Sequence, residues 1–359
     1  MKSIWIAAGG TGGHISPAVS LAYEFSNRGA SVTLITLPKN TDYPDIKSLV
    51  FHPSINVVTY PAPLMPTRPK PFLYFLPRML QCWFTLRQHN KMQQPEPIIG
   101  MGGYPSFPAT LFAKWNKIPL FLCEQNSVHG KITRLMQKYA QKVFLSFPQK
   151  DYKENEVLTG NPIRAIFSNE PKNKQKTKTP VKRDNRPILF FIGGSQGAKD
   201  LNQLYLYMTQ NEMLEEYKII ISTGKKDYEM MKQNARTGDE VYSFIENMPA
   251  TLKASAFIIA RAGSSTIFEG LWAKRPMVFL PYPFATDDHQ KINALHIQDL
   301  KVAEIIDLRP FNAAKAAEQL LTILSDKKYS EKEINRQFKD LPFPEKAQSA
   351  IADLVLSAI

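Results

Sequence analysis

The sequence contains one local pattern twice: a short apolar run, then a glycine-rich loop, then an amphipathic stretch. The first copy is Ser3–Ala8 followed by Gly9–His14, and the second is Ile188–Ile192 followed by Gly193–Gly197. An apolar run of about five residues ahead of a helical periodicity predicts a buried strand that leads into a helix. The repeated pattern therefore predicts two α/β domains, each of which begins with the same strand–loop–helix unit.

Strand and helix signals continue to alternate through both halves of the chain. In the first half, strands are expected at Ser31–Thr36, Ile98–Met101 and Leu120–Cys123. In the second half, they are expected at Lys218–Ser222, Val241–Phe244, Phe257–Ala260, Met277–Leu280 and Ala303–Ile306. This alternation is typical of doubly wound parallel sheets. The 359 residues also exceed the roughly 250–300 residues that one core usually serves.

We expect a first domain over residues 1–164 and a second over 165–342. The segment 169–186 is rich in Lys, Asn, Thr and Pro, which predicts a flexible, solvated basic loop. The last segment, about 343–359, predicts an amphipathic helix. This helix could pack on either domain, and packing back on the first is the arrangement we adopt.

The net charge of +13 is unevenly distributed, because residues 1–168 alone have a balance of +10. A basic half suits an anionic membrane, a phosphorylated substrate or nucleic acid. The two cysteines, Cys82 and Cys123, form no disulfide framework, so a reducing cytoplasm is expected. No run approaches the ~18–20 apolar residues that span a bilayer, and the N-terminus does not resemble a signal peptide.

The first glycine loop, Gly9–His14, predicts a place where an anion meets backbone N–H groups at a helix N-terminus. Its spacing departs from G-x-G-x-x-G, and the second strand ends without an acidic residue, so a dinucleotide site is disfavoured. His14 lies at the helix start, where the helix dipole favours the neutral imidazole and hence proton acceptance. A structural histidine that caps the turn is the alternative.

Three segments of the second half are candidates for nucleotide and sugar binding. The loop Gly193–Gly197 offers Ser195 to a phosphate, although a tight strand–helix turn would need the same glycines. In Arg261–Glu269, Glu269 could bind a ribose diol, or Thr266 and Glu269 could form a capping box. In the segment 287–293, Gln290 and Asn293 could contact sugar hydroxyls, or the segment could be a polar helix start.

No cluster of His, Cys, Asp or Glu has the spacing of a metal site, so no metal or other cofactor is expected to be required. A loosely bound divalent cation is left open. If a nucleotide diphosphate leaves during the reaction, helix N-termini and Arg164 would stabilise its negative charge in place of a metal ion.

The segment Arg68–Lys91 interleaves apolar and basic residues, which suits an anionic lipid surface. The residues that we assign to a membrane-facing surface are Phe75, Leu76, Met79, Trp83 and Phe84. An ordinary core helix is the alternative, because half of such a helix must face inward in any case.

The ordered motifs resemble those of the MurG family, which are inverting glycosyltransferases of the GT-B fold. The resemblance extends over nearly the whole chain and rests on GGTGGH (9–14), GMGGY (100–104), CEQNS (123–127), GNPIR (160–164), GGSQGA (193–198), RAGSSTIFE (261–269) and DDHQKINA (287–294). The resemblance implies two Rossmann-like domains that face a cleft. It also implies transfer of GlcNAc from UDP-GlcNAc to the MurNAc 4-hydroxyl of lipid I, giving lipid II for the cell wall.

The resemblance also implies roles for individual residues. His14 is the family's candidate base, and Tyr104 would lie on the acceptor side. Residues implied to contact UDP-GlcNAc are Thr11, Gly12, Gly13, Asn126, Arg164, Ser195, Ile245, Ser264, Ser265, Thr266, Ile267, Phe268, Glu269 and Gln290. The implied location is the cytoplasmic face of the inner membrane, bound peripherally. Other cell-wall synthesis proteins are possible partners, and nucleic acid is not expected.

Five residues depart from the family's pattern on the presumed acceptor side: Ser16, Pro105, Phe107, His129 and Lys131. They put the details of the acceptor in doubt and leave the donor chemistry intact. Two other functions therefore stay open: a diacylglycerol sugar transferase of the same fold, and a nucleotide-sugar-binding regulator without turnover.

Overall fold

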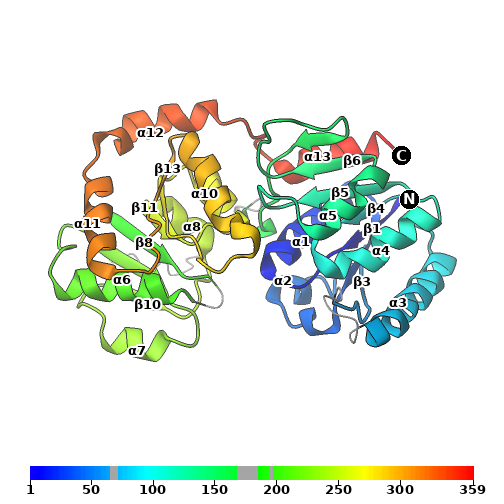
Figure 1. Ribbon diagram of the computed structural model, residues 1–359, viewed down its shortest axis with the longest axis horizontal. Helices are drawn as coiled ribbons and strands as arrows, with labels where there is room; N and C mark the ends of the chain where they lie inside the picture. Colours follow the sequence, from blue (N-terminus) through cyan, green and yellow to red (C-terminus); the bar gives the residue numbers. More distant parts are fainter. Residues whose placement is uncertain (65–71, 168–184, 195–196) are drawn as a thin grey trace. The chain divides into compact units, whose positions relative to one another are not determined.

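The computed structural model describes residues 1–64, 72–167, 185–194 and 197–359, and these form two compact units (Figure 1). The first unit comprises Met1–Ser168 and Phe343–Ile359, and the second comprises Asn169–Pro342. Most of the predicted basic loop 169–186 lies outside the described residues.

The first unit is built on a seven-stranded parallel sheet of order β3-β2-β1-β4-β5-β6-β7. Its strands are β1 (Ser3–Ala7), β2 (Ser31–Thr36), β3 (Ile55–Thr59), β4 (Ile98–Gly100), β5 (Leu120–Glu124), β6 (Lys142–Leu145) and β7 (Glu156–Leu158). β1 pairs with both β2 and β4. Because all the strands are parallel, their carboxyl ends and the loops that follow lie along one edge of the sheet, where α/β proteins bind ligands.

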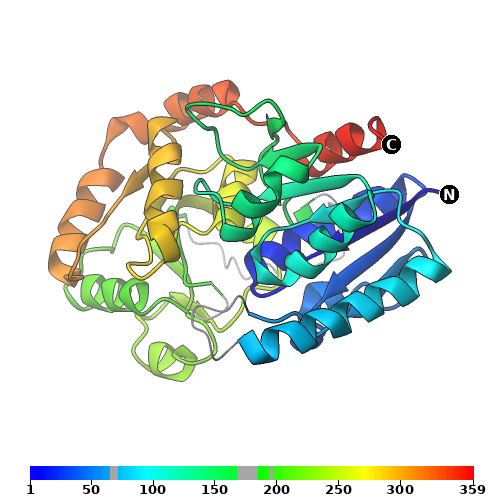
Figure 2. The same ribbon diagram turned by 45° about the vertical axis from the view of Figure 1, so that its right-hand side comes forward.

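Helices cover both faces of this sheet (Figure 2). They are α1 (Gly12–Asn27), α2 (Pro44–Lys47), α3 (Phe72–Met92), α4 (Gly103–Trp115), α5 (Lys131–Met136) and α13 (Ala347–Leu356). Ile4 and Ile6 pack with α1 and α13, whereas Trp5 and Ala7 on the same strand pack with α3 and α4. This alternation follows from the two-residue period of a strand.

The C-terminal helix α13 belongs to the first unit. Ile351 and Val355 are buried in the same apolar cluster as Phe25 of α1. Arg28, at the end of α1, forms an ion pair with Asp353 on α13. The apolar face of the predicted C-terminal helix thus packs on the first unit, beside α1 and β1.

The second unit has a six-stranded parallel sheet of order β10-β9-β8-β11-β12-β13. Its strands are β8 (Ile188–Ile192), β9 (Lys218–Ser222), β10 (Glu240–Tyr242), β11 (Ser255–Ala260), β12 (Met277–Phe279) and β13 (Ala303–Ile305). Its helices are α6 (Lys199–Gln210), α7 (Tyr228–Gln233), α8 (Met248–Ala254), α9 (Ser264–Ala273), α10 (His289–Asp299), α11 (Ala313–Leu324) and α12 (Glu331–Gln337).

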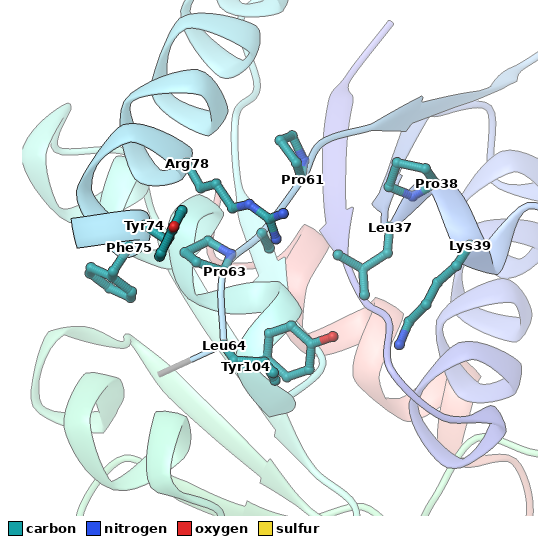
Figure 3. Close-up of a pocket in the computed structure, with 11 residues that line it drawn as sticks. Leu37, Pro38, Lys39, Pro61, Pro63, Leu64, Tyr74, Phe75, Arg78 and Tyr104 are labelled. Atoms are coloured by element: carbon teal, nitrogen blue, oxygen red, sulfur yellow. The ribbon is translucent and has the colours of Figure 1, made fainter. Parts of the chain in front are cut away.

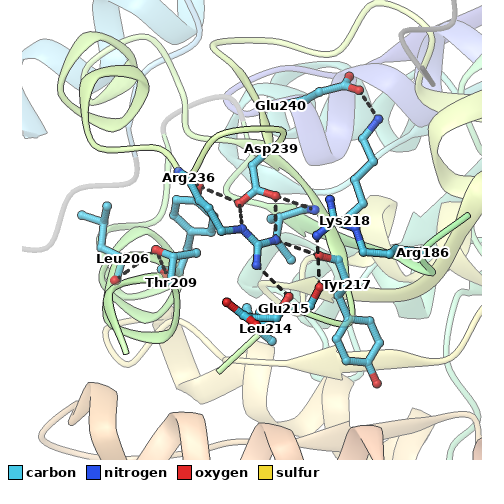
Figure 4. Close-up of polar contacts among 12 residues, drawn as sticks. Arg186, Leu206, Thr209, Leu214, Glu215, Tyr217, Lys218, Arg236, Asp239 and Glu240 are labelled. Carbon is cyan, nitrogen blue, oxygen red and sulfur yellow. Dashed lines mark hydrogen bonds and ion pairs between the residues drawn. The ribbon is translucent and has the colours of Figure 1, made fainter. Parts of the chain in front are cut away.

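A polar network anchors the edge of the second sheet (Figure 4). Arg236 donates hydrogen bonds to the carbonyl oxygens of Leu214 at 2.8 Å and Tyr217 at 2.7 Å. Its guanidinium also pairs with Asp239, whose carboxylate accepts the Ile219 N–H at 3.1 Å. β10 pairs with β9 over only three residues. The Arg236–Asp239 network therefore adds contacts that hold this edge strand to the rest of the sheet.

Candidate active site

The first glycine loop is clamped by two neighbouring loops. The Gly10 N–H donates to Oδ1 of the buried Asn40 at 3.1 Å, and Gly10 has a φ of +92°. A Cβ added at Gly9 would lie 2.9 Å from Cβ of Pro105. Glycine is therefore needed at both positions, by close approach at Gly9 and by conformation at Gly10. This clamping fixes the start of α1, where Gly12, Gly13 and His14 lie.

His14 occupies the first turn of α1, half-buried between two loops. Its Nδ1 lies 3.3 Å from Oγ1 of Thr11. A Cβ added at Gly102 or Gly103 would lie 3.5 Å from the imidazole ring, so the ring rests on the loop that follows β4. Both of these glycines have positive φ angles, 76° and 67°. The GGTGGH and GMGGY motifs are thus one structure, in which the second motif makes room for the histidine of the first.

The loop that contains Asn126 is held by a buried carboxylate. Glu124 ends β5, and its carboxylate accepts the N–H groups of Asn126 at 3.2 Å and Gly130 at 2.8 Å. It also accepts the hydroxyl of Thr133 at 2.6 Å. Burial raises the pKa of Glu124, although these hydrogen bonds act in the opposite direction. The sequence assigned no role to Glu124; a carboxylate at the end of a predicted buried strand was the available signal.

Gln125 connects this loop to the loop beside His14. Its side chain is almost wholly buried and donates to the Cys123 carbonyl at 3.2 Å. Among the described residues its Oε1 has no hydrogen-bond donor, and a Cβ added at Gly102 would lie 3.3 Å from it. Gly102 therefore lies between Gln125 and His14.

The remaining candidates of the first unit follow the same edge of the sheet. Tyr104 lies in the first turn of α4, and it is half-buried against the apolar cluster beneath α3 and α4. Arg164 follows β7, with its guanidinium 5.4 Å from the ring centre of Phe167. The segments that follow β1, β4, β5 and β7, loops together with the first turns of α1 and α4, thus contain seven residues predicted from the sequence: Thr11, Gly12, Gly13, His14, Tyr104, Asn126 and Arg164.

Two of the five departures from the family pattern support the first glycine loop. Ser16 donates to Oδ2 of Asp45 at 2.5 Å, which links α1 to α2. The carbonyl of Pro105 accepts the buried Tyr60 hydroxyl, and the Pro105 ring packs against Gly9. These residues therefore act within the fold, beneath the loop that contains His14.

The other three departures lie farther along the chain. Phe107 packs against the apolar cluster of α3 and α4. Nε2 of His129 lies 3.1 Å from Oε1 of Glu156, a distance that fits an ion pair when the imidazole is protonated. Lys131 is exposed at the start of α5.

Helix α3 has apolar residues on both of its faces. Cys82 and Leu86 are buried in the core. Leu76, Leu80 and Phe84 are spaced four residues apart, and they are exposed by 59%, 49% and 59%. They form one stripe on the outer face, which we call the α3 stripe.

The α3 stripe differs from the surface that the sequence predicted. Trp83 is half-buried and packs toward α4, with its ring centre 4.8 Å from that of Phe112 and 5.0 Å from that of Trp115. Phe75 and Met79 are half-buried, whereas Leu80 was not predicted to be exposed. The core-helix alternative thus accounts for one face only. None of the described helices meets the length and hydropathy that crossing a bilayer requires.

In the second unit, backbone contacts explain the glycines that follow β8. A Cβ at Gly193 would lie 2.8 Å from the Ser222 carbonyl oxygen, and one at Gly197 would lie 2.4 Å from that of Thr223. The segment after β8 is therefore the tight turn that the sequence offered as the alternative, because no side chain would fit at Gly193 or Gly197. Ser195, the predicted phosphate contact within it, lies outside the described residues.

Helix α9 presents its N-terminus at the carboxyl end of β11. Its N-cap is Gly263, which places Thr266 inside the helix, so Thr266 and Glu269 do not form a capping box. The hydroxyl oxygens of Ser264 and Ser265 are buried and have no hydrogen-bond partner among the described residues. Two buried hydroxyls at a helix N-terminus suit an anionic ligand. Glu269 lies farther along α9 and is largely buried.

Arg261 fixes this helix start against two neighbouring loops. It donates to the carbonyls of Leu280 at 2.9 Å and Pro281 at 3.1 Å, and to Asp200 on α6 at 2.8 Å. Arg261, in the loop after β11, thus joins that loop to the loop after β12 and to the first turn of α6. The sequence placed Arg261 in a motif without assigning this role.

Gln290 and Asn293 have different roles. Oε1 of Gln290 accepts the Tyr282 N–H at 2.9 Å, which directs its amide N–H₂ away from that bond. Asn293 is fully buried and donates to the Ala262 carbonyl at 3.2 Å, so it supports the α9 loop. The interpretation of Asn293 as a sugar contact is therefore wrong.

Ile245 follows the edge strand β10 and is buried. Two residues later, Asn247 caps α8 by accepting the Ala250 N–H at 3.2 Å. The predicted residues of the second unit thus come from the loop after β10 and from the helices α9 and α10, which follow β11 and β12: Ile245, Ser264, Ser265, Thr266, Ile267, Phe268, Glu269 and Gln290. Within the described ranges no three His, Cys, Asp or Glu residues are grouped as a metal site would need.

Comparison with known proteins identifies the family. The family model "Glycosyltransferase family 28 N-terminal domain" matches residues 4–145, and "Glycosyltransferase family 28 C-terminal domain" matches residues 188–352. The chain belongs to glycosyltransferase family 28. The first match covers β1 to β6 of the seven-stranded sheet, and the second covers the whole six-stranded sheet, so the GT-B fold expected from the motifs is confirmed.

Relatives within family 28 extend over most of the chain. A Leptospira interrogans UDP-N-acetylglucosamine–N-acetylmuramyl-(pentapeptide) pyrophosphoryl-undecaprenol N-acetylglucosamine transferase is 31% identical over 86% of each chain. The Elusimicrobium minutum protein of the same name is 28% identical over 99% of this chain and 100% of its own. The crystal structure of Acinetobacter baumannii MurG has a TM-score of 0.76 at 25% identity and matches 99% of this chain and 100% of its own. The resemblance to MurG is confirmed.

Proposed function

We propose that the chain transfers GlcNAc from UDP-GlcNAc to the MurNAc 4-hydroxyl of lipid I, with inversion at the anomeric carbon, and so produces lipid II. The observation on which this rests most is the near full-length similarity to transferases named for this reaction. The geometry around His14 is consistent with it, because a half-buried imidazole is held at the sheet edge by two glycine loops.

On the acceptor side, His14 removes the proton from the attacking hydroxyl as general base. Thr11, 3.3 Å from Nδ1, orients the imidazole. The Gly102–Gly103 backbone supports the ring from the other side. Tyr104 contacts the acceptor, and Asn126 contacts the GlcNAc. One displacement then forms the new C–O bond as the bond to UDP breaks.

On the donor side, the second unit binds UDP. The N-terminus of α9, with the hydroxyls of Ser264 and Ser265, meets the diphosphate, and Ser195 and Arg164 add donors. Glu269 binds the ribose diol, and the Ile245 backbone binds uracil. The amide N–H₂ of Gln290 donates to sugar hydroxyls, since its oxygen already accepts Tyr282 N–H. The reaction requires the two units to bring the anomeric carbon within reach of His14.

We propose that the enzyme binds the cytoplasmic face of an anionic membrane peripherally. The support is the α3 stripe together with the +10 balance of residues 1–168. Apolar side chains enter the interface while Lys and Arg attract anionic headgroups.

No metal ion is required in this proposal, because helix N-termini and Arg164 stabilise the leaving diphosphate. The enzyme should therefore keep more than about half of its activity in excess EDTA, since no Lewis acid takes part. A loss of activity with EDTA that Mg²⁺ restores would contradict this part of the proposal.

A donor and acceptor panel tests the function. Purified protein in detergent is given UDP-GlcNAc, UDP-glucose or UDP-galactose with a lipid I analogue or diacylglycerol, and UDP release is followed. We expect UDP release only for UDP-GlcNAc with the lipid I analogue. Transfer to diacylglycerol would favour a lipid glycosyltransferase of another specificity. UDP-GlcNAc binding without UDP release would favour a binding protein that lacks turnover.

A further inference from the structure

A pocket of about 470 Å³ lies in the first unit between α3, residues 61–64 and residues 37–39 (Figure 3). This volume is within the range of small-molecule sites. Its walls are mostly apolar, with contributions from Leu37, Pro61, Pro63, Leu64 and Tyr74. An apolar ligand segment would therefore be stabilised there by the removal of its surface from water.

The charged groups at this pocket have one sign. Arg78 and Lys39 line it, and none of its lining residues is acidic. Figure 3 shows the Arg78 guanidinium extending from α3 toward Pro61, with Lys39 and the Tyr104 hydroxyl entering the same space from the other side. No ion pair joins either cation to an acidic residue within the part of the chain that the structure describes. The occupant should therefore be anionic as well as apolar.

The pocket adjoins the candidate base through two loops. Tyr104 follows Gly103, whose added Cβ would lie 3.5 Å from the His14 ring. Lys39 precedes Asn40, which accepts the Gly10 N–H. On its other side, the pocket is bounded by α3, and Tyr74 at this border is 76% exposed. The pocket thus lies between the residue assigned to chemistry and the helix assigned to the membrane.

We infer that this pocket receives the phosphate-bearing end of a polyprenyl chain, the part of the acceptor between its sugar and the bilayer. The diphosphate pairs with Arg78 and Lys39, and the first isoprene units pack on Leu37, Pro63 and Leu64. This inference rests on the proposed function, because it concerns the acceptor of that reaction. It assigns substrate recognition to residues outside the family motifs.

A binding experiment without catalysis is the first test. The full chain is saturated with UDP, and farnesyl diphosphate is titrated by calorimetry below its micelle concentration. We expect binding that Arg78→Glu weakens about tenfold or more, because the charge facing the diphosphate is reversed. The matched control is Arg87→Glu on the same helix, outside the pocket, which should change the affinity less than twofold. Equal affinities for wild type and both variants would overturn the inference.

The second test uses acceptor analogues in detergent, where membrane binding does not contribute. One analogue has a prenyl diphosphate and the other has a methyl diphosphate on the same MurNAc-peptide. Leu64→Asp places a carboxylate at an exposed wall position, so we expect the KM for the prenyl analogue to rise about tenfold. The KM for the methyl analogue and for UDP-GlcNAc should change less than twofold. Val50→Asp, also exposed in the first unit, is the control.

The outcomes separate this inference from the proposed function. If wild type transfers GlcNAc but Leu64→Asp discriminates no better than Val50→Asp, the pocket assignment is wrong and the function stands. If dihexanoyl phosphatidylglycerol displaces farnesyl diphosphate at equal concentration, the pocket serves a bilayer phospholipid and the prenyl assignment is wrong. If wild type transfers GlcNAc to neither analogue, the proposed function itself fails.

Discussion

At the scale of single residues, the account depends on His14 and the atoms that orient it. Replacing His14 by Ala should lower kcat by about 10²- to 10⁴-fold, the usual contribution of a general base. The KM for UDP-GlcNAc and the melting temperature should change little, because the imidazole is half-buried at a loop. Steady-state kinetics with a lipid I analogue measure this. A kcat within threefold of wild type would remove His14 from the base role.

The glycines beneath His14 provide a second test at this scale. Gly102→Ala places a Cβ 3.5 Å from the His14 ring and 3.3 Å from Gln125, at a φ of +76°. The control for an alanine at positive φ is Gly29→Ala, at a φ of +81° with no atom within 4 Å of the added Cβ. Gly29→Ala should lose about 1 kcal/mol of stability, the cost of an alanine at positive φ. Gly102→Ala should lose more, about 1–3 kcal/mol, because a ψ of −178° places Gly102 in a region that essentially only glycine adopts. Only Gly102→Ala should also lower kcat.

Urea unfolding and kinetics on the two glycine variants measure these effects. Equal kcat values for Gly102→Ala and Gly29→Ala would show that the loop after β4 does not position His14.

At the scale of elements, helix α3 connects packing with membrane binding. Changing Leu76, Leu80 and Phe84 to Ser should release the protein from anionic vesicles, because these side chains form the exposed α3 stripe. The melting temperature should stay within a few degrees, since little buried area is lost. The control changes Val50 and Phe51, which are exposed elsewhere on the first unit, to Ser. Co-sedimentation with vesicles that is unchanged in the α3 variant would contradict the assignment.

Trp83 illustrates what the sequence could and could not predict at this scale. The mixture of aromatic and basic residues indicated an interfacial helix, but it did not say which face points outward. Contacts with Phe112 and Trp115 decide that, and these come from another helix. Trp83→Ser should therefore lower the stability of the first unit. The upper limit of the loss is the ~3–5 kcal/mol that truncation of a large core side chain costs.

The longest strands that the sequence predicted are recognisable from their own residues. β1, β2, β8 and β9 are runs of five or six almost wholly buried residues with apolar centres, which makes them recognisable from the sequence. Three strands of the first sheet escaped prediction: β3 (Ile55–Thr59), β6 (Lys142–Leu145) and β7 (Glu156–Leu158). β3 and β7 are the two edge strands of that sheet, and each is fixed by pairing with its single neighbour, β2 or β6, as well as by its own sequence. The residues of the candidate site were predicted from the ordered sequence motifs. Glu124, Gln125 and Arg261 were missed as supports, because their partners lie in other loops or along the folded backbone.

At the scale of the whole molecule, ion pairs make the second unit sensitive to acid. Burial alone would raise the pKa of Glu304, but hydrogen bonds from Lys328, Gln298 and Tyr329 outweigh it and hold that pKa below the usual range. A lowered carboxylate pKa contributes stability above the unfolded-state pKa of about 4.3. That stability is lost as the pH falls through the lower folded-state value.

Glu304→Gln should therefore destabilise the protein at pH 7, and the difference from wild type should shrink steadily as the pH falls below about 4. Urea unfolding across this range measures it, with Glu318→Gln at an exposed position of α11 as the control. A difference that is the same at pH 7 and at pH 3 would contradict the ionic origin of the effect.

The chain as a whole is proposed to join one sugar to one acceptor hydroxyl with inversion, and the product tests this most directly. The lipid product formed from UDP-GlcNAc and a lipid I analogue would be isolated, and its new glycosidic bond would be assigned by NMR. We expect a single GlcNAc attached β-1,4 to MurNAc, with one UDP released for each bond formed. An α-linkage, attachment at another hydroxyl, or no GlcNAc-containing lipid would contradict the central claim.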